Sequence, residues 1–340
     1  MRAADRRERG IVLVVVLFFI LLLTSAIATF LRRAMLDASI ATHRDRARAA
    51  EALARGGIRL GETLLLEDLR LKGAQGGPDS LHDIWGRVRG IDLEEDPDAT
   101  LYLEIEDAAA RIDLNGFLVK GEVPTEKRAE LEQLLTGVIA VMPGNPDERA
   151  GYEPDVLAAN LADWLDADEV TATGTPEDEL YQKRDPPYRS ANRPLLSVDE
   201  LRLVDGFDGP LVDALRPFVG VYPLVGGEGV NVNTAPPWVL AQLTLGTDVS
   251  GFRPIETDDV ERIVKEREDG PLCSGETAGS TCTALADLLS GETLSPKPTE
   301  HSSVFVVRAT AKVLDVERRI ETVVDRTDPS ALERLSWHVE

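Results

Sequence analysis

The sequence predicts an α+β fold in which a long N-terminal helix packs on an antiparallel sheet, with a large all-helical domain inserted between the strands of that sheet. Three observations support this prediction. An apolar N-terminal run leads into an amphipathic stretch with few helix breakers, two regions far apart in the chain alternate like strands, and the region between them has helical periodicity. A chain of 340 residues is long enough for two or three such units.

The first element is the uncharged run of residues 11–31. As a helix, this run would rise about 32 Å, enough to cross the hydrocarbon core of a bilayer. Residues 32–70 are rich in Ala, Leu, Arg and Glu, so we expect the helix to continue beyond the membrane as an amphipathic one. Composition leaves three interpretations open: a signal peptide cut after Ala28, an uncleaved signal anchor, or a leader cut after Gly10.

Alternation of apolar and polar residues predicts the strands. Every second residue from Leu101 to Ile105 is apolar, which indicates a strand within residues 101–113. Two further alternating runs, residues 303–313 and 316–325, are rich in Val, Ile and Thr and flank a short turn. They predict a C-terminal hairpin that joins the first strand in one antiparallel sheet.

The middle of the chain, residues 119–222, has the pattern of several short helices. Part of it resembles a helix-hairpin-helix (SAM-like) unit with Gly206 and Gly209 at its turn, a motif that often holds a nucleic-acid phosphate with backbone amides. Here Asp205 and Asp208 flank the turn, and the whole chain carries a net charge of −23, which repels phosphates. We therefore expect a helical packing module and no nucleic-acid partner.

The sequence contains no recognisable catalytic constellation. Its four histidines are scattered, and the chain has no G-x-S-x-G, H-E-x-x-H or phosphate-binding glycine motif. We expect no enzyme activity and name no catalytic residues.

An acidic cluster in the middle region is the main candidate site. Asp163, Asp166 and Asp168 lie close together, and Glu177 and Asp178 follow across a loop rich in Thr, Gly and Pro. Calcium binds six to eight oxygen ligands at about 2.3–2.6 Å and tolerates flexible loops, although this spacing is not that of an EF-hand. The residues alone leave two possibilities open: a calcium site, or a solvated acidic loop in which Asp163 and Asp166 cap helices.

Both cysteines of the chain, Cys273 and Cys282, lie in one loop. In an oxidising compartment they would form a disulfide, which would contribute roughly 2–3 kcal/mol by constraining a short loop. In a reducing compartment they would be two free thiols.

Several motifs resemble one protein family. The Arg-Gly pair before the apolar run resembles the leader of type IV pilins and type II secretion pseudopilins. The segments LADWLDADEVTATGTPEDELY, PPYRSANRPLLSVDELRLVDGF and VNVNTAPPWVLAQL, in this order, resemble the large minor pseudopilin family called GspK. The resemblance extends from Gly10 to about Asp325 and implies a pilin-like core.

The resemblance also implies how the N-terminus is processed. A prepilin peptidase would cut after Gly10 and methylate Ile11, which makes Val15 the fifth mature residue. Most members of the wider pilin family carry glutamate there, paired with the amino terminus of a neighbour, whereas GspK typically lacks it. Because an unpaired charge in lipid is costly, the valine marks a subunit with nothing above it.

The function implied by the resemblance is that of a minor pseudopilin at the tip of the type II secretion pseudopilus, which supports the export of folded proteins. The implied location is the bacterial inner membrane, crossed once, with the head in the periplasm. The implied partners are GspI, GspJ, the major pseudopilin, the prepilin peptidase and the inner-membrane assembly platform. Two alternatives remain: a minor tip pilin of a type IV pilus, and an acidic calcium-binding periplasmic protein with a cleaved signal peptide.

The family is associated with calcium in its helical domain, so the resemblance favours a calcium site. Its expected ligands are the following: Asp166, Asp168, Glu177 and Asp178, with Asp163 or Glu169 as alternates.

The predicted organisation divides the chain into eight segments. They are a leader (1–10), the membrane half (11–31) and periplasmic half (32–70) of the helix, the first pilin-like part (71–118), the inserted helical domain (119–222), a second helical segment with a variable Cys loop (223–300), the C-terminal hairpin (301–327) and a tail (328–340).

Overall fold

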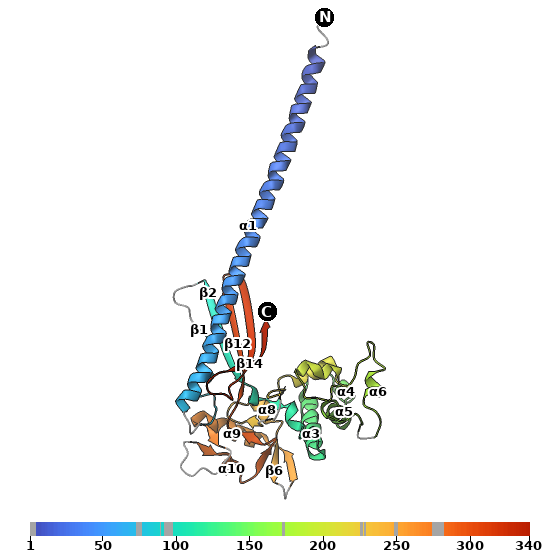
Figure 1. Ribbon diagram of the computed structural model, residues 1–340, viewed down its shortest axis with the longest axis vertical. Helices are drawn as coiled ribbons and strands as arrows, with labels where there is room; N and C mark the ends of the chain where they lie inside the picture. The colour runs from blue at the N-terminus through green and yellow to red at the C-terminus, as the bar shows by residue number, and fades with distance from the viewer. Residues whose placement is uncertain are drawn as a thin grey trace.

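The molecule is a long helical rod attached to a globular head, as the computed structural model in Figure 1 shows. The N-terminus lies at the free end of the rod and the C-terminus lies beside the part of the rod that enters the head. The structure describes residues 5–72, 77–88, 90–91, 98–171, 174–224, 227, 229–247, 251–273 and 282–340.

The rod is α1 (Asp5–Lys72), one continuous helix that passes through the predicted leader, membrane span and amphipathic half. Large apolar side chains from Ile11 to Ile40 are exposed, and the side chain of Val15 is 46% exposed. Within the described part of the chain, α1 is the one helix that is long and apolar enough to cross a membrane. Gly10 and Ile11 lie within the helix, so the predicted cleavage point is not marked by a break in the backbone.

The lower half of α1 packs on an antiparallel sheet with the strand order β1-β2-β12-β13-β14. Apolar residues alternate along the strands and meet buried helix residues such as Ile58 and Leu65, which confirms the predicted α+β core. The strands are β1 (Gly90–Ile91), β2 (Ala99–Asp107), β12 (Val304–Val313), β13 (Val316–Asp325) and β14 (Glu333–Val339).

The predicted tail, residues 328–340, is mostly the strand β14, so that part of the predicted organisation was wrong. β14 pairs with β13 and presents Trp337 toward α1, where the guanidinium of Arg55 lies 5.5 Å from the ring centroid. Glu62 of α1 also accepts hydrogen bonds from Arg334 at 2.6 and 2.8 Å. The strand itself is exposed or half-buried, and its partners on the rod lie far away in sequence, so the pattern of residues at the chain end does not predict it.

The helical domain follows β2 and returns to the core at β4, where Ile112 pairs with Val219 in a short parallel bridge. Its helices pack around a core that includes Trp164, Leu161 and Leu211. The elements are η2 (Ala108–Ala110), β3 (Ile112–Asp113), η3 (Leu114–Phe117), α3 (Thr125–Val141), α4 (Pro146–Arg149), α5 (Pro154–Leu165), α6 (Asp178–Tyr181), η4 (Val198–Leu203), α7 (Gly209–Leu215) and β4 (Val219–Gly220).

Residues 223–300 are not the second helical segment that we expected, because short strands alternate with the helices there. Thr244 of β6 pairs with both Ser295 and Pro254, which makes a small three-stranded sheet. The elements are β5 (Val230–Asn231), α8 (Pro237–Leu240), β6 (Thr244–Thr247), β7 (Gly251–Pro254), α9 (Thr257–Asp269), β8 (Leu272–Cys273), β9 (Thr283–Ala284), α10 (Leu285–Leu288), β10 (Thr293–Ser295) and β11 (Pro298–Thr299). In this structure Cys273 and Cys282 form a disulfide with their Cα atoms 5.8 Å apart.

Two glycines of α1 let the rod approach the sheet closely. A Cβ atom at Gly61 would lie 2.6 Å from Cγ1 of Val307, and one at Gly57 would lie 2.9 Å from Cβ of Ala309. The neighbouring Gly56 faces open space, with nothing within 4 Å of its Cβ position. The contact between helix and sheet therefore depends on the absence of side chains at Gly57 and Gly61.

We predict opposite effects of alanine at Gly61 and at Gly56. Gly61→Ala should lower the free energy of unfolding by about 1–3 kcal/mol, because Val307 is buried and β-branched and has little room to move. Gly56→Ala should raise it by up to about 1 kcal/mol, because alanine is the better helix former. Urea unfolding of the full chain in detergent measures both values, and equal effects of the two changes would contradict this account of the packing.

Candidate metal centre

Three carboxylates converge in the helical domain. Asp166, Asp168 and Glu177 each offer an oxygen atom, and these oxygens all lie within 4.8 Å of one another. Asp166 and Asp168 come from the chain just after α5, and Glu177 comes just before α6. Sequence reasoning predicted all three as ligands, and the structure brings them together.

The loop between these residues is folded so that its two ends meet. Val170 forms an isolated bridge with Pro176, and the N–H of Thr171 donates to the carbonyl of Thr175 at 2.8 Å. One step further out, the N–H of Glu177 donates to the carbonyl of Glu169 at 3.3 Å. This narrow loop returns Glu177 to the end of α5.

The convergence leaves buried oxygens without hydrogen bonds of normal geometry. They are Oδ1 of Asp166 and both carboxylate oxygens of Glu177, a residue that is 4% exposed. Burial, and then the charges of Asp168, Asp163 and Glu122, raise the pKa of Asp166 to about 6. Burial, and then the charges of Asp166 and Asp163, raise the pKa of Glu177 to about 7, which the nearby Ser190 hydroxyl opposes only in part.

The other predicted ligands, Asp178, Asp163 and Glu169, are not part of this group of three. Oδ1 of Asp178 accepts hydrogen bonds from the N–H and the hydroxyl of Ser190 at 3.0 and 3.3 Å, so this oxygen is used within the protein. Asp163 lies near enough for its charge to raise the pKa of Asp166 and Glu177, but it is outside the group of three. Glu169 is exposed and contributes its main-chain carbonyl to the loop.

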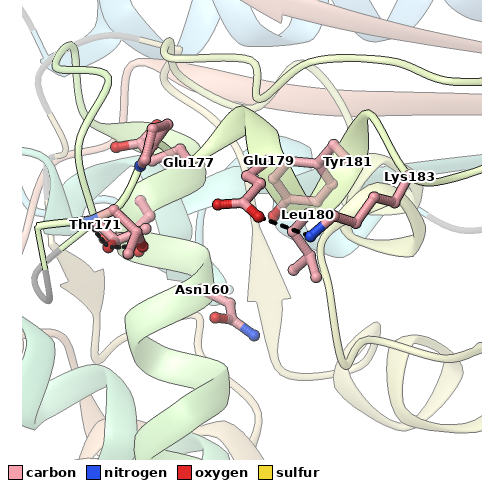
Figure 2. A pocket seen from close by; sticks show the side chains of 10 residues that line it. Asn160, Thr171, Glu177, Glu179, Leu180, Tyr181 and Lys183 are labelled. Atoms are coloured by element: carbon pink, nitrogen blue, oxygen red, sulfur yellow. Dashed lines mark hydrogen bonds and ion pairs between the residues drawn. The ribbon is translucent and has the colours of Figure 1, made fainter.

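The donor set fits a hard cation. All three converging ligands are carboxylates, and buried carboxylate oxygens without donors are stabilised by a divalent ion. A pocket adjoins the group, and Figure 2 shows its walls: Thr171 and Glu177 on one side, and Asn160 and the Glu179–Lys183 ion pair on the other.

The turn at Gly206 and Gly209, which resembles a phosphate-binding motif and which we expected to serve in packing, is covered by the protein itself. A Cβ at Gly206 would lie 2.7 Å from Cδ2 of Leu157, so the turn packs against α5. Oδ1 of Asp208 accepts from the N–H of Leu211 at 3.0 Å, and Asp205 forms an ion pair with Arg184. These contacts support the packing role that we expected.

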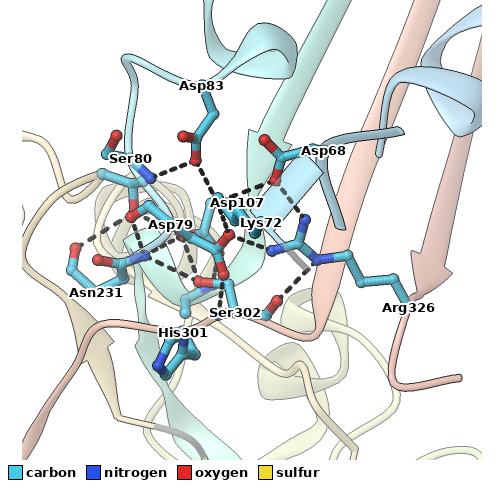
Figure 3. A network of polar contacts seen from close by, with 12 residues as sticks. Asp68, Lys72, Asp79, Ser80, Asp83, Asp107, Asn231, His301, Ser302 and Arg326 are labelled. Atoms are coloured by element: carbon cyan, nitrogen blue, oxygen red, sulfur yellow. Dashed lines mark hydrogen bonds and ion pairs between the residues drawn. The ribbon is translucent and has the colours of Figure 1, made fainter. Parts of the chain in front are cut away.

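A second group of acidic residues, which sequence reasoning missed, lies at the end of α1 (Figure 3). Nζ of Lys72 lies 3.0 Å from Asp68, 2.6 Å from Asp79 and 2.7 Å from Asp83. Burial alone would lower the pKa of Lys72, but Asp79 and Asp83 outweigh it and raise the pKa above its ordinary value. The ammonium group thus occupies the space between these carboxylates, so the group is an internal ion cluster and not a candidate metal site.

The fold and the centre together define a class of protein. A rod with an uncovered apolar half, a pilin-like sheet that packs on its other half, and a head enlarged by an inserted helical domain are the plan of a large pseudopilin. A family model described as type II secretion system, protein K, matches residues 110–224, which hold the candidate metal centre.

Relatives along most of the chain show the family. The type II secretion system protein K of Pseudomonas aeruginosa is 33% identical over 245 residues, which cover 70% of this chain and 68% of the relative. The corresponding protein of Klebsiella pneumoniae is 30% identical over 239 residues, 68% of each chain. The chain belongs to the type II secretion system protein K family and is a minor pseudopilin of that system.

A solved structure shares the fold. A chain of the GspK-GspI-GspJ complex from the type 2 secretion system of enterotoxigenic Escherichia coli matches with a TM-score of 0.58 and 19% identity. The match covers 87% of this chain and 98% of that one, so the likeness includes the inserted domain as well as the core.

The raised pKa of Glu177 predicts how stability changes with pH when divalent cations are removed. The folded chain holds this proton up to about pH 7, whereas the ordinary value is 4.5, so the contribution to stability is full below pH 4.5 and is lost as the pH rises toward 7. Glu177→Gln should match the wild type at pH 5 and exceed its free energy of unfolding by about 1–2 kcal/mol at pH 8, less than the full pKa shift would give because solvent screens part of the charge. Urea unfolding with a chelator measures the difference, and a difference that does not change with pH would contradict the assignment.

Proposed function

We propose that this minor pseudopilin occupies the tip of the pseudopilus, where it initiates assembly and carries its head outward. The observation that carries the proposal is the combination of a large head with an uncharged upper rod, in which the fifth residue of the predicted mature chain is Val15. A neighbour above would bring an amino terminus into lipid, and a valine offers that cation no counter-charge. A subunit at the tip has no neighbour above it and therefore needs no counter-charge.

The exposed apolar surface of α1 indicates what the rod binds. Met35, Leu36 and Ile40 extend this surface beyond the predicted span, and their side chains are 71%, 56% and 49% exposed. A surface of this kind fits the rods of other pseudopilins, and the solved chain with this fold is in a complex with GspI and GspJ. We therefore propose GspI, GspJ and the major pseudopilin as partners in the filament.

The proposed location is the inner membrane, with the head in the periplasm. α1 supplies a single span, and the disulfide between Cys273 and Cys282 is of the kind that persists in an oxidising compartment. In this scheme a prepilin peptidase cuts after Gly10, and the assembly platform then receives the rod. The protein acts through assembly, without a chemical reaction of its own.

We further propose that the candidate metal centre binds calcium through Asp166, Asp168 and Glu177. The buried oxygens without donors support this proposal, because a bound divalent ion would offset the repulsion between the three carboxylates. Calcium would supply positive charge and hold the 169–176 loop against the end of α5. Its role would be to stabilise the head.

The leader assignment predicts the mature N-terminus. Mass spectrometry of the membrane-extracted chain should find N-methylated Ile11 as the first residue, which leaves the whole span attached to the head. An N-terminus at Thr29 would instead show removal of a signal peptide, and the tip-subunit proposal would then be wrong.

The calcium proposal predicts a rise in melting temperature. Calcium at about 100 times its Kd should stabilise the full chain by about 2.7 kcal/mol, and Glu177→Gln should abolish most of that gain. Glu179→Gln is the matched control, because Glu179 lines the adjoining pocket but pairs with Lys183 outside the group of three. Thermal unfolding in detergent with calcium or with a chelator measures the effect, and an equal loss in both variants would argue against the assigned ligands.

A further inference from the structure

We infer that residues 188–195, called the strap below, hold the two ligand-bearing arms of the metal centre in place and thereby set its affinity for calcium. The first arm is residues 166–168 after α5, and the second is residues 177–178 at the start of α6. The inference rests on the proposed calcium binding. Sequence reasoning did not single out any residue of the strap as functional.

The strap binds the first arm through Asn192. Its N–H donates to the carbonyl of Trp164 at 3.0 Å, and its Nδ2 donates to the carbonyl of Asp168. The last carbonyls of a helix lack partners within the helix, so the bond to Trp164 caps α5, and the bond to Asp168 holds the chain just beyond its end. Asn192 itself has φ +46°, a left-handed conformation that asparagine adopts more readily than most residues.

The strap binds the second arm through Ser190. Its N–H and hydroxyl both donate to Oδ1 of Asp178, the residue next to Glu177. Nε of Arg189 also lies 3.6 Å from Oδ2 of the same carboxylate. Ser190 and Asn192, two residues of one short segment, therefore connect both arms.

Both ends of the strap are anchored away from the arms. The N–H of Leu195 donates to Oδ1 of Asn115 at 2.7 Å, and its carbonyl accepts from Nδ2 of Asn115 at 3.0 Å. At the other end, the Tyr188 hydroxyl donates to the carbonyl of Leu203 at 2.8 Å, and its ring centroid lies 5.3 Å from that of Tyr181. These anchors involve no group of the metal centre, so the strap is fixed independently of the cation.

Fixing the arms beforehand raises affinity for an ion. Asp166, Asp168 and Glu177 repel one another, and arms free to separate would do so whenever the cation leaves. A strap that holds both arms keeps the carboxylate oxygens close together. Less conformational freedom is then lost when the cation binds. Residues that orient ligands in this way typically change metal affinity 10–100-fold when they are removed.

The test uses Asn192→Gly in the full chain in detergent. Glycine accepts the left-handed backbone of this position, so the change removes the side-chain hydrogen bond to Asp168 without adding strain. Asn160→Ala is the matched control, since its Nδ2 also donates to a main-chain carbonyl, that of Asp205 at 3.0 Å, in the same domain. Calorimetric titration with calcium chloride gives the Kd of each protein.

We expect the calcium Kd to rise about 10-fold or more in Asn192→Gly and to stay within twofold of wild type in Asn160→Ala. Ser190→Ala, which weakens the second arm, should raise the Kd in the same direction. The melting temperature in chelator should be similar for Asn192→Gly and Asn160→Ala, while the increase caused by calcium should shrink in Asn192→Gly alone. A purely structural role would lower the melting temperature equally with and without calcium.

Two results overturn the inference in distinguishable ways. If the wild type and Asn160→Ala bind calcium and Asn192→Gly binds it within twofold of them, the strap does not position the arms. If the wild type itself shows no calcium binding, the proposed metal centre is wrong, and the inference fails with it.

Discussion

The half-buried Lys72 and the buried Arg326 lie among aspartates where α1 ends, and the architecture of the head depends on this contact (Figure 3). Nη1 of Arg326 lies 3.2 Å from Asp68 of α1, and a second nitrogen of the same guanidinium pairs with Asp79. The end of the rod, residues 79–83 and the chain after β13 are thereby joined. Buried charges persist only when they are paired, and loss of one partner typically costs about 3–5 kcal/mol.

Much of the core could be predicted because its pattern is local. The alternation from Leu101 to Ile105 and the hairpin turn at residues 314–315 give the positions of β2, β12 and β13 directly. β14 was missed because none of its residues is buried and its contacts are with β13 and with Arg55 and Glu62 of α1, which lie far away in sequence. The small sheet around β6 was missed because its strands are only three or four residues long and β10 pairs with β6 from about 50 residues further along the chain.

The metal centre, too, could be predicted from the sequence only in part. Asp166, Asp168 and Glu177 were predicted from oxygen-rich spacing and a resemblance, and the folded loop brings them together. Asp178, which follows Glu177 directly, was predicted with them. Successive residues point in different directions, however, and Oδ1 of Asp178 accepts a hydrogen bond from Ser190. Asn192 carries no signal of its own, since its role consists of hydrogen bonds to the main-chain carbonyls of Trp164 and Asp168, which are distant in sequence.

The site where the helical domain joins the core lies between the membrane rod and the metal centre. Asn115 donates to the carbonyls of both Leu195 and Val221, so it links the strap to the chain that leaves the domain. On the core side, Oδ2 of Asp107 accepts from Thr234 at 2.6 Å and from Ser302 at 2.7 Å. Hydrogen bonds of buried groups thus lie on both sides of this junction, around Asp107 in the core and around Asn115 beside the strap. The position of the strap relative to the core therefore depends on Asn115, which bonds both the strap and the chain that leaves the helical domain.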